Sequence, residues 1–101
     1  KKLMRLTAQN CDIISIPDDL CDLNELYMLD LHHNRQLETI PGGFGKLSSL
    51  IALNIDNTNI NPETIEKLKT WGESKKEKCH VVFYKKKLYH FSLIIIFVFL
   101  L

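Results

Sequence analysis

The sequence predicts an α/β repeat fold, in which short parallel strands alternate with irregular return segments and one helix follows near the C-terminal end. Three observations predict it. A leucine motif occurs three times at spacings of 23 and 24 residues, an Ile-Pro pair follows each of the first two motifs, and residues 61–72 carry the start and stop signals of a helix. Because one coil cannot bury its own apolar face, consecutive coils are expected to stack around one interior.

The strand prediction depends on three rows that align with one another. They read L-x-x-L-x-A-x-x-C at residues 3–11, L-x-x-L-x-L-x-x-N at residues 26–34 and L-x-x-L-x-I-x-x-T at residues 50–58. Inside the rows, Leu29-Asp30-Leu31 and the matching residues 53–55 alternate with the period of two that marks a half-buried strand.

The segments between the rows also align, over residues 13–23 and 37–47. Each contains an Ile-Pro pair, with the prolines at Pro17 and Pro41. Proline lacks the backbone N–H that a strand ladder needs, so regular pairing ends there. These return segments are therefore expected to be irregular or to form short helical turns.

This pattern, L-x-x-L-x-L-x-x-N/C-x-L followed by Ile-Pro, resembles that of leucine-rich repeat proteins over about residues 3–71. The resemblance implies a leucine-rich repeat solenoid of about three repeats, with short parallel strands on the concave side and a C-terminal capping helix. Two positions depart from the family pattern. Ala8 occupies a leucine position, and Thr58 stands where the family has Asn or Cys.

The last residue of each row is expected to satisfy buried backbone groups in the turn after the strand. Asn34 brings both donors and an acceptor to this task, whereas Thr58 offers one hydroxyl and Cys11 one weak donor. We therefore expect Cys11 to be a buried small hydrophobe. Cys21, beside Leu20 on the outer half of the coil, is expected to be partly exposed.

The third coil ends in a predicted helix that closes the C-terminal end of the stack. Asn61 is a suitable N-cap, Pro62 takes the first helical position and Gly72 lies past the end. Ile65 and Leu68 then fall on one stripe that faces the core.

Charge and hydropathy divide the 101 residues into three unlike segments. Residues 1–70 carry 7 basic and 10 acidic side chains, residues 71–101 carry 6 basic and 2 acidic ones, and ten of the last eleven residues are apolar. The averages of 46% apolar and 25% charged residues exclude a disordered chain, a polybasic arm and a multi-span membrane protein. We expect residues 1–72 to be the solenoid, 73–87 a basic linker or a short extra strand, and 88–101 a hydrophobic tail.

The tail and the cysteines bear on localisation. Residues 88–101 would measure roughly 21 Å as a helix, short of the bilayer core of about 30 Å. Two interpretations stay open: the basic segment and tail attach the protein to a membrane, or they are a solvated charge run with an apolar end. Three cysteines without a disulfide framework favour a reducing compartment. The expectation is a cytoplasmic protein, with membrane association through the tail as the alternative.

The candidate site is the strand face that points away from the core. Its mixture of polar side chains with an aromatic, a methionine and an arginine is typical of a protein-binding face, although solvated strand positions would look similar. The expected binding residues are Arg5, Thr7, Gln9, Tyr27, Met28, Asp30, His32, Asn54 and Asp56. The predicted function is non-catalytic protein–protein recognition by an adaptor or scaffold piece. The alternative is a membrane-anchored receptor or adaptor fragment.

Other chemistry is weakly indicated. His32-His33 cannot readily chelate one ion because adjacent strand residues diverge, and Cys79-His80 has no second half of a metal site. The glycine-rich residues 42–45 lack the Lys-Ser/Thr of a phosphate loop, and no nucleophile motif is present. We therefore expect no enzyme activity, cofactor, metal, nucleic acid or small-molecule substrate.

Overall fold

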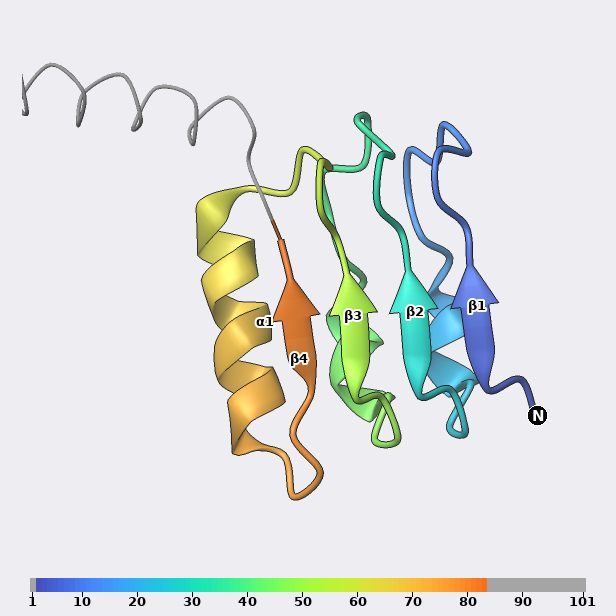
Figure 1. The fold of residues 1–101 in the computed structure, drawn as a ribbon, viewed down its shortest axis with the longest axis vertical. Helices are drawn as coiled ribbons and strands as arrows, with labels where there is room; N and C mark the ends of the chain where they lie inside the picture. The colour runs from blue at the N-terminus through green and yellow to red at the C-terminus, as the bar shows by residue number, and fades with distance from the viewer. Residues whose placement is uncertain (1, 84–101) are drawn as a thin grey trace, which may run out of the picture.

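The computed structural model describes residues 2–83, whose centre is a sheet of four parallel strands in the order β1-β2-β3-β4. Figure 1 shows the strands side by side in chain order. The strands are β1 (Arg5–Thr7), β2 (Met28–Asp30), β3 (Ala52–Asn54) and β4 (His80–Val82). Four parallel strands and one α-helix fit the α/β repeat fold that the sequence predicts.

The strands are aligned without slippage, so that one central row runs straight across the sheet. Leu6 pairs with Leu29, Leu29 with Leu53 and Leu53 with Val81. Leu29 and Leu53 are completely buried. The predicted alternation therefore places the leucines on the core side and their neighbours on the opposite face.

The return segments contain two short 3-10 helices, η1 (Asp18–Asp22) and η2 (Gly42–Lys46), which lie behind the strands in Figure 1. Each begins directly after the proline that ends regular pairing, as expected. The expectation of a partly exposed Cys21 is wrong, because this side chain is only 2% exposed. The two helices pack against each other, and a Cβ on Gly43 would lie 3.5 Å from the Cβ of Cys21.

The predicted helix is α1 (Pro62–Ser74), and the Asn61 side chain caps it by accepting a 2.7 Å hydrogen bond from the Thr64 N–H. Its predicted end is wrong, because Gly72 lies inside the helix. The reason is tertiary: Cys79 N–H donates to the Gly72 carbonyl at 2.9 Å, and a Cβ on Gly72 would lie 2.5 Å from the Cys79 carbonyl oxygen.

Of the two alternatives for residues 73–87, the structure contains the strand, since β4 continues the parallel sheet. The division into domains stays a prediction, and the tail at 88–101 lies outside the described residues. Within residues 2–83, no helix is long and apolar enough to cross a membrane.

The expected role of Asn34 is confirmed. Its buried amide accepts hydrogen bonds from the Cys11 and Ile13 N–H groups at 2.9 and 3.0 Å, and donates to the Ala8 and Leu31 carbonyls at 2.9 and 2.8 Å. One side chain thus joins two coils.

The expectation of a buried Cys11 is wrong, because its side chain is exposed and its thiol donates a hydrogen bond to the Gln9 carbonyl at 3.2 Å. No described coil lies beyond β1 to cover it. Thr58 occupies the same position of the third motif as Cys11 and Asn34 occupy in the first two, and its hydroxyl donates one hydrogen bond to the Ile55 carbonyl at 2.8 Å.

Candidate protein-binding face

The sheet face, as we name it, comprises the side chains that alternate with the buried leucines of the four strands. Strand register sets two rows across it: Arg5, Met28, Ala52 and His80, then Thr7, Asp30, Asn54 and Val82. A third row holds Gln9, His32 and Asp56, because the backbone ladder continues beyond the strands. Asn10 N–H donates to the His32 carbonyl at 3.0 Å, and His33 N–H donates to the Asp56 carbonyl at 2.9 Å.

The structure brings the nine sequence-predicted residues together on three consecutive coils. Arg5, Thr7 and Gln9 on the first coil are exposed. The six residues on the second and third coils are half-buried: Tyr27, Met28, Asp30, His32, Asn54 and Asp56. Neighbouring coils restrict these six side chains while leaving part of each one accessible.

Short polar contacts order the middle of the sheet face. Asp30 Oδ1 accepts a hydrogen bond from the His32 backbone N–H at 3.1 Å and lies 2.5 Å from His32 Nδ1. One coil further on, Asn54 Oδ1 accepts from the Asp56 N–H at 3.0 Å. The same turn therefore recurs after β2 and β3, held by an Asp in one case and an Asn in the other.

The next residue in each coil adopts a left-handed backbone conformation. Asn10, His33 and Asn57 have φ angles of 55°, 64° and 57°. Asn, Asp and His tolerate this region better than most residues, which explains their recurrence at this position. The His33 Nδ1 and Asn57 Nδ2 atoms lie 3.2 Å apart, so adjacent turns also contact each other.

Two residues of the sheet face, His80 and Val82, were missed by sequence reasoning. They belong to β4, in the segment for which a linker and a strand were both open. The signal was the run His80-Val81-Val82-Phe83 between lysine clusters, which is rich in strand-forming residues. The distance in sequence from β3 to this run is longer than the 23–24-residue spacing of the earlier strands, because α1 lies between β3 and β4.

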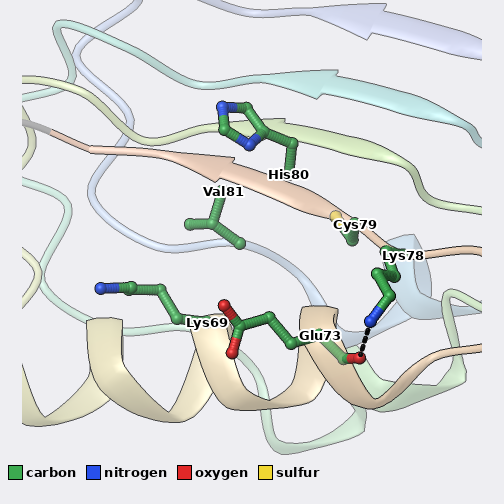
Figure 2. A pocket seen from close by; sticks show the side chains of 6 residues that line it. All are labelled: Lys69, Glu73, Lys78, Cys79, His80 and Val81. Atoms are coloured by element: carbon green, nitrogen blue, oxygen red, sulfur yellow. Dashed lines mark hydrogen bonds between the residues drawn. The ribbon is translucent and has the colours of Figure 1, made fainter.

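A hollow lies between α1 and β4, away from the sheet face (Figure 2). Figure 2 shows His80 and Val81 on opposite sides of the strand, and the Lys78 ammonium donates to the Glu73 carbonyl at 3.3 Å. Burial raises the pKa of the Cys79 thiol, and the nearby Lys75 offsets this only partly. This thiol therefore stays protonated at neutral pH, which makes it a poor nucleophile. The lining residues are Lys69, Glu73, Lys78, Cys79, His80 and Val81.

Among residues 2–83, no group of three or more His, Cys, Asp or Glu side chains is placed to hold a metal ion. The His32 ring forms a close pair with Asp30 and an edge-to-face contact with His33, at 4.7 Å between ring centroids.

The fold and the sheet face together define a class: an α/β repeat protein whose parallel strands present one continuous surface of mostly polar side chains. The family model for the Leucine Rich Repeat matches residues 25–47, which include β2, its turn and η2. This match supports a leucine-rich repeat at residues 25–47. This family generally serves in binding rather than catalysis, so the match is consistent with protein–protein interaction. A search of curated proteins finds no match.

Proposed function

We propose that this chain is a non-catalytic recognition piece of an adaptor or scaffold, and that it binds a protein partner through the sheet face. The observation that carries the proposal is the strand register, which sets the outward side chains in unbroken rows over four strands. A regular array of this kind offers many contact points to a partner, and the buried alternate residues keep it rigid.

The composition and the ordering of the sheet face support this proposal. Tyr, Met and Arg are enriched in protein interfaces. This surface holds Met28 and Arg5, and Tyr27 directly precedes β2. Binding costs less conformational entropy when side chains are already ordered. The contacts around Asp30 and Asn54 supply that order before a partner arrives.

We further propose that the coils form a short solenoid of about three repeats, with the sheet face on its concave side and α1 as a capping helix. Ile65 and Leu68 of α1 are only 4% and 6% exposed, and Trp71 packs edge-to-face on Phe44 at 5.7 Å between ring centroids. The helix thereby covers apolar surface that the third coil would otherwise expose.

A binding comparison tests the role of the sheet face. The full chain and a variant with Tyr27, Asp30, His32 and Asp56 changed to alanine are used as bait, and recovered proteins are quantified by mass spectrometry. We expect specific partners to be retained by the unchanged chain and lost from the variant.

The matched control changes four exposed residues of η1, η2 and α1 to alanine: Asp18, Asp19, Lys46 and Lys67. It should retain the partners. Equal recovery from the face variant and the unchanged chain would defeat the assignment, provided that circular dichroism shows both to be folded.

A further inference from the structure

An apolar row lies at the start of the strands, next to the polar rows of the sheet face. It consists of Met4, Tyr27 and Ile51, which are backbone neighbours: Tyr27 N–H donates to the Met4 carbonyl at 2.8 Å, and Ile51 N–H donates to the Tyr27 carbonyl at 2.9 Å. Met4 is 51% exposed and Ile51 is 45% exposed. The row therefore offers apolar surface on three successive coils.

The exposure of Ile51 does not arise from its lying at an end of the sheet. Tyr27 precedes it in the row, and on its other side the His80 N–H donates to the Ile51 carbonyl at 2.9 Å. Leu50, directly before it, and Leu53, two residues after it, are completely buried. Isolated exposed apolar residues are common, but a contiguous set rimmed by polar groups marks an interaction site.

The opposite end of the sheet face carries negative charge. Asp30 and Asp56 are its acidic residues. Within residues 2–83 no Lys or Arg forms an ion pair with either, and the close contact of Asp30 is with the His32 ring, at 2.5 Å between Oδ1 and Nδ1. Asp56 Oδ1 is shielded from solvent and has no hydrogen-bond partner in the described part of the chain. Because Oδ1 is shielded, a donor from a partner would approach the accessible part of the half-buried Asp56 carboxylate, whose charge a cation would pair with.

The distance between the apolar row and the two aspartates sets the length of a peptide that could contact both. Tyr27 and Asp30 are three residues apart on one coil, and Ile51 and Asp56 are five apart on the next. At about 3.3 Å per residue these steps correspond to roughly 10 and 16 Å. An extended peptide covers that distance in three to five residues.

We propose that the sheet face binds an extended basic segment of a partner protein. One bulky apolar side chain of the segment lies on the apolar row, and an Arg or Lys three to five residues away pairs with Asp56 and Asp30. The inference rests on the proposed function and adds the chemistry of the partner. Charge complementarity selects the basic residue, and a guanidinium suits the carboxylates best because it can donate two parallel hydrogen bonds.

Selection from a phage-displayed library of random peptides tests this chemistry, with the purified full chain as bait. We expect the enriched peptides to share an aromatic or aliphatic residue and an Arg or Lys at that spacing. Enrichment of acidic peptides, or no enrichment, would overturn the inference. Enriched peptides that lack a basic residue but fail to bind face variants would overturn the inference while leaving the proposed function intact.

The location is tested with one enriched synthetic peptide, by fluorescence anisotropy. Ile51→Glu and Asp56→Asn should each weaken binding about tenfold or more, as expected when one partner of an interfacial contact is removed. The control is Ile14→Glu, because Ile14 is an exposed isoleucine, at 66%, located between β1 and η1. Affinity that is unchanged in both face variants would contradict the inference and the proposed function together.

A charge exchange gives a stricter test. Asp56→Arg should abolish binding of the Arg-containing peptide, and a peptide with Glu in place of that Arg should bind the variant better than the unchanged chain. Circular dichroism and thermal melting confirm that each variant is folded. Failure of the exchange, with folding intact, would contradict direct pairing between Asp56 and the basic side chain.

Discussion

Asn34 shows how much of this fold depends on a single side chain. It is the buried polar residue among the core positions, and its amide forms four hydrogen bonds to the backbone of two coils. A hydrophobic residue of similar size would leave these backbone groups buried without partners. The sequence indicates this role through the repeat position alone, since the amide is the side chain with enough donors and acceptors.

Replacing Asn34 with Leu should lower the free energy of unfolding by about 3 kcal/mol or more, because several buried backbone groups lose their partners at once. Urea denaturation followed by circular dichroism measures the change. Asn59→Ala is the control, since Asn59 is exposed and its amide makes one long contact of 3.4 Å to Glu38. An Asn34 variant as stable as the control would contradict the assigned role.

The three cysteines differ in exposure, and their reactivity should differ accordingly. Cys11 is exposed, whereas Cys21 and Cys79 are buried. Burial raises the pKa of both buried thiols, and for Cys21 the nearby Asp18 acts in the same direction. At neutral pH one thiol per folded chain should react rapidly with a thiol reagent, and Cys11→Ser should remove that rapid phase. Rapid labelling of two or three thiols in the folded chain would contradict the buried positions.

The same shift links stability to pH. An unfolded thiol ionises near its ordinary value of 9.0, while the buried thiols of the folded chain require a higher pH. Their contribution to stability is therefore fully present below pH 9.0 and is lost as pH rises through the folded pKa.

At the scale of elements, the contact between α1 and β4 determines how the sheet ends. Gly72 allows the two backbones to approach closely, and Lys75, which caps the helix, donates to the Ser48 and Leu50 carbonyls at 2.7 Å each. Lys75 also lies over the Trp71 ring, 5.4 Å from its centroid. These contacts join the helix end to the third coil and direct the chain into β4.

Gly72→Ala should destabilise the protein by about 1–3 kcal/mol, because its Cβ would lie 2.5 Å from the Cys79 carbonyl oxygen and the backbones would have to separate. Gly42→Ala is the matched control, since a Cβ there meets nothing within 4 Å. Thermal unfolding of both variants, monitored at the same protein concentration, makes the comparison. Equal melting temperatures would show that the close approach at Gly72 is unimportant for stability.

At the scale of the whole described chain, residues 2–83, the first coil is less buried than the second and third. Leu3, the counterpart of Leu26 and Leu50, is 42% exposed, whereas both of those residues are completely buried. In repeat folds the stability is a sum over the repeats and their nearest-neighbour contacts, so a coil with one described neighbour is expected to be held less firmly than a coil with two. Local opening is therefore expected to begin at β1.

Hydrogen exchange can measure this gradient at equivalent bonds. The Ala8, Leu31 and Ile55 amides each donate across the ladder to the next coil at 2.8 Å. Despite equal bond lengths, the Ala8 amide should exchange at least about tenfold faster than the other two, because the first coil opens at a smaller free-energy cost. Equal protection of all three amides would mean that the described residues unfold as one cooperative unit.

Local patterns allowed much of this protein to be predicted from its sequence. The leucine phase identified the first three strands, and the period of two within each strand identified the outward residues of the sheet face. The prolines located η1 and η2, and Asn61 with Pro62 located the start of α1. All of these signals arise from neighbouring residues, because backbone geometry and side-chain alternation are local properties.

Only the tertiary structure decided the features that depend on residues far apart in the chain. It paired β4 with β3, which added His80 and Val82 to the sheet face, and it extended α1 past Gly72 because the Cys79 backbone packs there. It buried Cys21 of η1 against η2 and left Cys11 exposed after β1. Burial and strand pairing are set by what lies across the core, which no stretch of neighbouring residues specifies.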